Sequence, residues 1–166
     1  MFWGQETLLS FPELVARQSE TGPDLPLSDQ ALLLYYFATA NGSPLAQRWV
    51  SFSELPDGRF YNQAFKGYTG RELARTYGEN LQALSLAARR LGAGLPGGAP
   101  VGDRSFLFRP LPRVPLLLVF WQGDEEFPSS FQILFDASAS HYLPTAVCAV
   151  LGSMLARRLI SMQQAS

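Results

Sequence analysis

The second half of the chain alternates hydrophobic and polar residues in a way that is typical of β-strands. The alternation runs through residues 106–109 and again through residues 131–136. Between them, residues 116–121 are continuously apolar, which is typical of a strand buried on both faces. These segments predict a three-stranded antiparallel meander, with 116–121 as its central strand and Val119 buried.

Other segments predict helices. Residues 31–38 are apolar on every side, which favours a buried helix that Ser28 caps and that ends at Asn41-Gly42. Residues 81–91 place their apolar side chains on one helical face, and Asn80 is the predicted N-cap of this second helix.

A last helix is predicted over residues 145–160. Its expected inward face consists of Val147, Val150, Leu151, Met154 and Leu155. The N-terminal residues 6–18 fit neither the helical nor the strand period cleanly. They form either two short strands broken at Pro12 or a helix that starts at Ser10.

The middle of the chain carries a turn signal. Residues 49–54 and 60–65 flank Leu55-Pro56-Asp57-Gly58, in which proline presets the turn and glycine accepts a positive φ. This pattern predicts a β-hairpin. Thr69 and Glu72 then have the spacing of a capping box, which predicts that a short helix begins there.

Strands in local antiparallel groups, separated by helices, are typical of the α+β class. We predict an antiparallel sheet (a hairpin plus a three-stranded meander) packed against helices in a single domain, residues 1–166. The glycine-rich residues 92–103 predict a flexible internal loop. Within it, residues 92–97 satisfy G-x-G-x-x-G, but dinucleotide binding requires a strand before that motif and a helix after it. The predicted order is the reverse, so we interpret the segment as a loop.

Composition narrows the possible functions. The chain has 166 residues and a formal net charge of −1, with 47% hydrophobic and 16% charged residues. Such a chain is not disordered, and its charge offers no electrostatic footprint for nucleic acid. Its one cysteine, Cys148, cannot form an internal disulfide or supply a zinc or iron–sulfur site by itself. We therefore expect no metal, no cofactor and no nucleic acid.

Targeting signals are not apparent in the sequence. The first ten residues have no basic n-region, and the apolar runs 31–38 and 114–121 are too short to span a bilayer. We expect a cytoplasmic protein without a membrane partner.

Two sets of residues are candidates for chemistry. His141 is the one histidine, and Asp136, Ser138 and Ser140 lie near it in sequence, although no nucleophile-elbow motif occurs. A hydrogen-bonded loop anchor is the commoner role for such a histidine. The acidic turn 124–126 has three carboxylates, but its spacing is not that of an EF-hand, and a solvated turn explains it better.

The richest polar and aromatic segment lies in and after the predicted hairpin. Arginine and tyrosine suit an anionic or planar partner, and a following helix N-terminus at Thr69 would offer backbone N–H groups to an anion. An ordinary amphipathic hairpin is the alternative interpretation. The candidate binding residues are Arg59, Tyr61, Asn62, Gln63, Lys66 and Tyr68.

Three segments resemble a family of uncharacterised bacterial and archaeal proteins. They are residues 48–68, residues 106–136, whose GDEEFP segment is specific, and residues 141–155 with the LPT segment. The resemblance covers most of the chain from about Leu27 onward. It identifies a domain of unknown function that in some members lies beside an iron–sulfur cluster domain. The resemblance implies no activity, and because this chain has no cluster-ligating cysteines, a redox role would need a partner.

Two hypotheses follow. The first is a non-enzymatic binding or accessory module, whose partner is a protein of a redox or metallocofactor system. The alternative is an enzyme of unknown class that uses the acidic turn 124–126 and His141. The predicted topology weakens this alternative, because the two loops would lie at opposite ends of one strand.

Overall fold

A four-stranded antiparallel sheet organises the molecule. The structure is a computed structural model that describes residues 1–97 and 101–164. The strand order is β3-β6-β5-β4. The strands are β3 (Trp49–Ser51), β4 (Arg104–Leu111), β5 (Val114–Trp121) and β6 (Ser130–Asp136), and each neighbouring pair is antiparallel. The predicted α+β class and the meander of β4, β5 and β6 are confirmed.

Strand β5 is buried on both faces. Its residues Leu116 and Leu118 belong to the main core, whereas Leu117 and Val119 belong to a smaller cluster on the opposite face. Val119 is fully buried, as predicted from the continuous apolar run. A hydrophobic residue at nearly every position therefore reflects a strand with packing on both sides.

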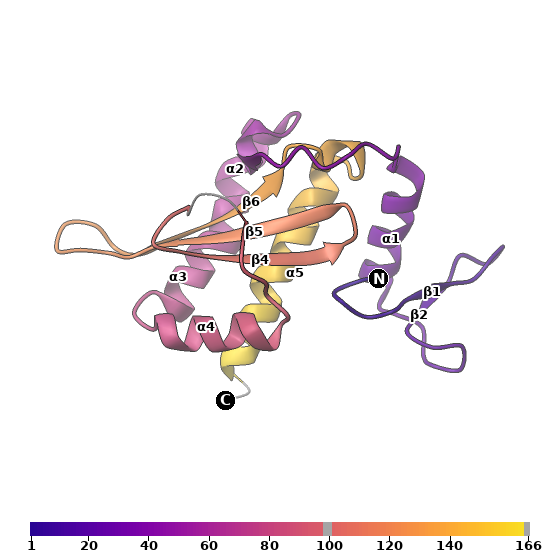
Figure 1. Cartoon of the computed structure of the whole chain (residues 1–166), viewed down its shortest axis with the longest axis horizontal. Helices are drawn as coiled ribbons and strands as arrows, with labels where there is room; N and C mark the ends of the chain where they lie inside the picture. The colour runs from indigo at the N-terminus through magenta and orange to yellow at the C-terminus, as the bar shows by residue number, and fades with distance from the viewer. Residues whose placement is uncertain (98–100, 165–166) are drawn as a thin grey trace.

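Helix α5 (Thr145–Gln164) crosses one face of the sheet, with α3 and α4 beside it (Figure 1). Its buried residues include Leu151, Leu155 and Leu159, but Val150, which we predicted to face inward, is 41% exposed. By length and composition α5 could cross a membrane. The core helix of a soluble protein has the same properties, and here α5 contacts α1, α3 and α4.

Helix α1 (Leu27–Thr39) confirms the predicted helix but not its surroundings. Its N-cap is Pro26 rather than Ser28. Only one side is buried, through Asp29, Leu32 and Leu33, while Tyr35 and Phe37 are 51% and 60% exposed. The prediction of a helix buried on every side is wrong.

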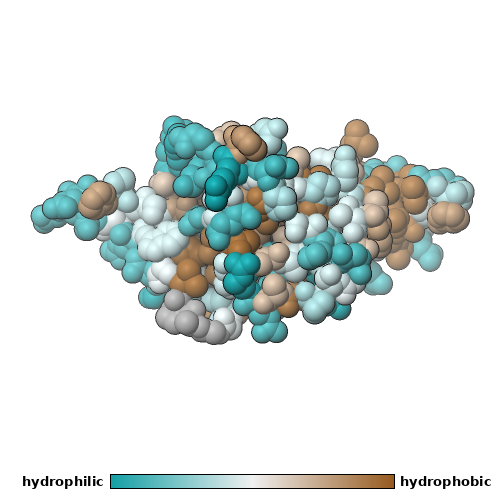
Figure 2. Space-filling view, turned by 90° about the horizontal axis from the view of Figure 1, so that it is seen from above, coloured by the Kyte–Doolittle hydropathy of each residue, from teal (hydrophilic) through white to brown (hydrophobic). Residues whose placement is uncertain are grey.

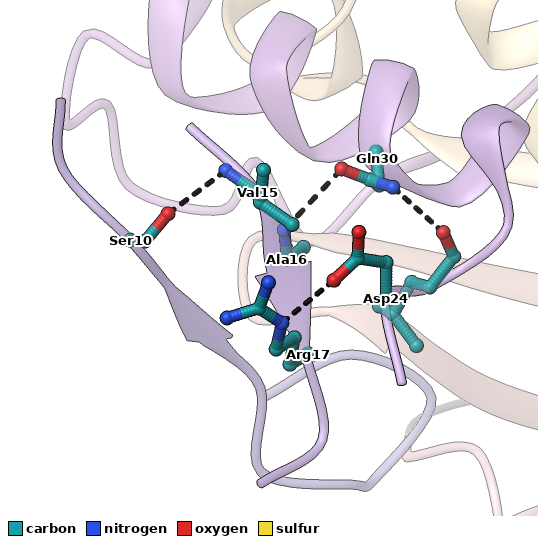
Figure 3. Close-up of polar contacts among 7 residues, drawn as sticks. Ser10, Val15, Ala16, Arg17, Asp24 and Gln30 are labelled. Carbon is teal, nitrogen blue, oxygen red and sulfur yellow. Dashed lines mark hydrogen bonds and ion pairs between the residues drawn. The ribbon is translucent and has the colours of Figure 1, made fainter. Parts of the chain in front are cut away.

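The N-terminal arm is a two-stranded hairpin of β1 (Leu8–Leu9) and β2 (Ala16–Arg17), so the first of our two interpretations is confirmed. The side-chain amide of Gln30 ties this arm to α1, because it accepts from the Ala16 N–H and donates to the Leu25 carbonyl (Figure 3). An ion pair of 2.6 Å between Arg17 and Asp24 closes the following loop.

Residues 58–77 are helical, so the predicted hairpin with a strand at 60–65 is wrong. Helix α2 (Gly58–Lys66) continues through a π-helical turn, Gly67–Arg71, into α3 (Glu72–Tyr77). The chain does turn at residues 55–58, as predicted, but Asp57 rather than Gly58 takes the left-handed conformation (φ 58°). Gly58 packs against the Phe52 carbonyl, where a side chain would collide with the backbone.

A four-residue spacing drives this helix formation. The buried residues Phe65, Thr69, Leu73 and Tyr77 lie on one helical face. The capping box predicted at Thr69 is also wrong, because the Thr69 hydroxyl donates to the Phe65 carbonyl within the continuous helix. The free helix N-terminus that we expected there does not exist.

The next helix, α4 (Leu81–Arg90), is confirmed together with its cap, since the Asn80 side chain accepts from the Ala83 N–H at 2.9 Å. After α4, the described parts of residues 92–103 are attached to the sheet. Gly94 pairs with Leu107, and the Asp103 N–H donates to the Phe120 carbonyl. Residues 98–100 of the predicted flexible loop lie outside the described residues.

Candidate functional site

A cleft of about 570 Å³ lies between the helical segment 66–75 and the start of β6. Its helical wall contributes Lys66, Gly70, Arg71 and Arg75, and Trp121 closes its opposite side at the end of β5. Residues 128–132 form the remaining wall. We call this hollow the basic cleft.

The π-helical turn reaches the sheet where β6 lacks a strand neighbour. Strand β3 pairs with residues 134–136 alone, so within residues 1–97 and 101–164 the first half of β6 has one edge without a strand partner. Gly70 lies against the Phe131 carbonyl at this edge, and any side chain there would collide with the backbone. Glycine at position 70 therefore sets the distance between the two walls of the cleft.

The π-helical turn also determines which side chains enter the cleft. In a regular α-helix, Lys66 and Arg71 would point about 140° apart, because each residue advances the helix by about 100°. A turn that closes between residues i and i+5 contains one residue more, and both side chains line the same hollow. Arg75 follows Arg71 by one α-helical turn and lines it too.

This helical segment concentrates positive charge. Residues 58–77 contain four basic residues and one acidic residue, a net charge of +3 in a chain whose total is −1. Arg75 pairs with Glu72 at 2.8 Å, but both side chains are exposed, so this ion pair contributes little. Lys66 and Arg71 make no ion pair with any other residue in the described part of the chain.

The structure divides the six predicted binding residues among three places. Arg59 and Lys66 are two α-helical turns apart, and Asn62 and Gln63 lie between them on the same face of α2. In the view from above, the surface on the side of α2 is mainly hydrophilic, with some hydrophobic residues among the hydrophilic ones (Figure 2). Of the six, only Lys66 lines the basic cleft.

The two tyrosines lie elsewhere. Tyr61 lines a separate hollow of about 490 Å³ together with Phe60 and Pro144. The Tyr68 ring packs edge-on against Phe65, with ring centroids 5.9 Å apart, and burial raises the pKa of its hydroxyl. The aromatic residue that lines the cleft beside the basic residues is instead Trp121, which we did not select from the sequence.

Arg71 and Arg75 were also missed. Their signal in the sequence is the spacing of four residues between them. This spacing places both side chains on one helical face, opposite to that of Leu73 and Tyr77. It becomes visible only when residues 58–77 are treated as one helix.

A family model described as a domain of unknown function, DUF3786, matches residues 1–158. The chain belongs to this family. The match begins at Met1, so the DUF3786 domain includes the N-terminal arm, which the resemblance from about Leu27 did not cover. No curated protein and no solved structure matches the chain significantly. The family description names no activity for a DUF3786 domain, so the function must be argued from the sites themselves.

The alternative site, made of the acidic turn 124–126 and His141, is not assembled in this DUF3786 domain. Strand β6 separates them, since the turn precedes its first residue and His141 follows its last. Asp124 shapes its own turn by accepting from the backbone N–H groups of Phe127 and Glu126, and these bonds lower its pKa. His141 bonds to Asn41 at 3.1 Å, as expected of a loop anchor.

The serine candidates lack a base as well. The Ser138 hydroxyl donates directly to Asp136 at 2.6 Å, and within the described residues the hydroxyl of neither Ser138 nor Ser140 bonds to the His141 ring. Cys148 is no better placed to react, because burial raises the pKa of its thiol to about 12 and keeps it protonated. Neither group has the arrangement of an activated nucleophile.

Proposed function

We propose that this DUF3786 domain is a non-enzymatic binding or accessory module, and that its basic cleft holds an acidic segment of a partner protein. The observation that carries the proposal is the convergence of Lys66, Arg71 and Arg75 on one hollow through the π-helical turn. Isolated π-helical turns within α-helices are frequent at functional sites.

The chemistry of the cleft fits an acidic peptide. Two guanidinium groups can each donate two parallel hydrogen bonds to a carboxylate, and a lysine adds a flexible point charge. Trp121 adds a flat apolar surface, the kind of anchor on which binding energy is concentrated in protein interfaces. Arg59 and Gln63 extend the same helix face beyond the cleft and would meet a longer segment.

The kind of partner comes from the family resemblance rather than from the cleft. The resemblance implies that some relatives carry this domain beside an iron–sulfur cluster domain, which supports a partner from a redox or metallocofactor system. A cytoplasmic location and the lack of nucleic acid and membrane partners stay predictions of the sequence.

Binding of a labelled decaglutamate peptide, followed by fluorescence anisotropy, tests the cleft. We expect the double variant Lys66→Ala/Arg71→Ala to bind about tenfold more weakly than the wild type, with binding that falls as salt is raised. Its melting temperature should stay within about 2 °C, because both side chains are exposed.

The matched control is Arg109→Ala/Arg157→Ala, which removes the same charge from two exposed positions outside the cleft. It should bind the peptide within about twofold of the wild type. Equal losses in the two double variants would show that net charge alone attracts the peptide, and the proposal would then be wrong.

A further inference from the structure

A second cavity, of about 360 Å³, lies between the N-terminal arm, the first turn of α1 and the C-terminal half of α5. Its polar walls include Trp3, Gln5 and Gln18 from the arm, Asp29 from α1 and Arg158 from α5. It shares no lining residue with the basic cleft, and its volume lies within the range of small-molecule sites.

A strained turn places Trp3 at this cavity. Trp3 has a positive φ of 49°, which is an outlier for a bulky residue, and Gly4 follows with a φ of 78°. Reciprocal backbone hydrogen bonds between Phe2 and Gln5 hold the turn, and the Trp3 N–H donates to the Pro110 carbonyl at 2.9 Å. Strain of this kind is concentrated at ligand clamps and active sites.

The strained turn sets the indole of Trp3 over the Arg158 guanidinium, 4.7 Å from the ring centroid. Within the described residues, however, the indole Nε1 is buried without any hydrogen-bond partner. A buried donor without a partner loses its hydrogen bonds to water and gains none in the protein, so a ligand that accepts from it would be favoured.

Asp29 is incompletely satisfied at the same place. Its side chain is buried, and among the described residues it accepts one hydrogen bond, a long one of 3.3 Å from the Ser28 hydroxyl. The nearest Arg158 nitrogen is 3.7 Å from the Asp29 carboxylate, which is an ion pair but too long for a hydrogen bond. The residue with unused acceptor capacity, Asp29, and the residue with the unused donor, Trp3, therefore line the same cavity.

We propose that this cavity binds a small zwitterion of the α-amino acid class, with its ammonium group at Asp29 and its carboxylate at Arg158 and the Trp3 indole N–H. A simple anion would meet the Asp29 carboxylate, and a simple cation would meet Arg158 and Arg90, which also lines the cavity. One molecule that carries both charges satisfies both sides. This site is independent of the proposed function of the basic cleft.

The experiment is a thermal-shift screen of the twenty proteinogenic L-amino acids, tested singly at 10 mM on the full chain, followed by calorimetric titration of those that stabilise it. We expect at least one to bind with a Kd of a few millimolar or tighter. Acetate and methylamine at the same concentration should not bind, because each carries only one of the two charges. This comparison uses the wild-type protein alone and does not depend on any variant.

Variants then locate the site. Asp29→Asn and Arg158→Gln should each weaken binding at least tenfold, and Trp3→Phe, which keeps a ring but removes the N–H, about threefold to tenfold. Arg157→Gln, next to Arg158 in sequence but exposed, is the matched control and should stay within twofold. The proposal is overturned if no amino acid binds at 10 mM, if acetate binds as tightly as the best amino acid, or if Arg158→Gln binds with unchanged affinity.

Discussion

Two buried carboxylates occupy opposite situations in this molecule. Asp136, at the end of β6, is 2% exposed, and one of its oxygens accepts from the Ala46 N–H at 2.8 Å, the Ser138 N–H at 2.9 Å and the Ser138 hydroxyl at 2.6 Å. Asp29, in the first turn of α1, is 7% exposed, yet among the described residues its carboxylate has one long hydrogen bond and a distant guanidinium. Burial alone does not distinguish the two groups.

The number of donors does distinguish them. Burial by itself would raise the pKa of Asp136, but hydrogen bonds from Ser138 and from the backbone N–H groups of Ala46 and Gln47 outweigh it and lower the pKa. Hydrogen bonds from other parts of the chain therefore satisfy the Asp136 carboxylate. These bonds tie the linker before β3 to the loop after β6. Asp29 retains capacity that its own chain does not use, which is what a ligand-binding group requires.

The largest effect should come from a third carboxylate that has no donors at all. Val119→Asp would place a charge among Leu117, Leu107 and Leu134 on the second face of the sheet, where the neighbouring side chains are apolar. We expect loss of soluble, folded protein. Circular dichroism and soluble yield measure this, with Val119→Ala as a control that should remain folded. A cooperative, soluble Val119→Asp protein would contradict the buried position of β5.

Removal of the well-satisfied carboxylate should have the next largest effect. Asp136→Ala leaves the Ser138 hydroxyl and the neighbouring N–H groups without their acceptor, and we expect a loss of about 3 kcal/mol in the free energy of unfolding. The difference should depend on pH. Because the folded pKa lies below the ordinary value of 3.8, the stabilisation is complete well above that value and is lost as the pH falls toward the folded pKa.

Urea denaturation at pH 7, pH 5 and pH 3 measures both parts of this expectation. The gap between wild type and Asp136→Ala should be nearly the same at pH 7 and pH 5 and should narrow at pH 3. Other carboxylates contribute to both proteins and cancel in the difference. A gap that widened on acidification would mean that the pKa of Asp136 is raised, not lowered.

The smallest effect on stability should come from the incompletely satisfied carboxylate. Asp29→Asn keeps the shape of the side chain and removes one long ion pair of 3.7 Å, whose Arg158 side is partly exposed, so we expect a change within about 0.5 kcal/mol in the absence of amino acids. Urea denaturation of the ligand-free protein measures it. A loss as large as that of Asp136→Ala would show that the two carboxylates have the same structural role.

The meander was predictable from the sequence because its three strands follow one another and each shows a pattern that is typical of a strand. Residues 106–109 and 131–136 alternate, and residues 116–121 are continuously apolar. Residues 60–65 also alternate over a similar length, and a turn signal precedes them. Their helical character depends on burial at Phe65, Leu73 and Tyr77, which extends beyond that window.

The two sites were less predictable, since each joins residues that are far apart in the sequence. The basic cleft requires the approach of Gly70 to Phe131 and the position of Trp121 at the end of another strand. The second cavity brings together Trp3, Asp29 and Arg158. Lys66 was among the residues selected from the sequence, but the residues with which it lines the cleft depend on tertiary packing and on a π-helical turn that has no pattern in the sequence.

That π-helical turn makes the length of the segment 67–71 as important as its composition. Deleting one residue there would let α2 and α3 join as a regular α-helix, which by itself is the more stable arrangement. Arg71 and Arg75 would then follow Lys66 by four and eight residues, about 40° and 80° around the helix, so the three cations would still share one side. A segment that keeps all its residues but closes into a regular α-helix would instead rotate everything after it by about 100°. A DUF3786 domain with one residue fewer here should therefore retain a basic cleft, whereas one with the same length and no π-helical turn should lack it.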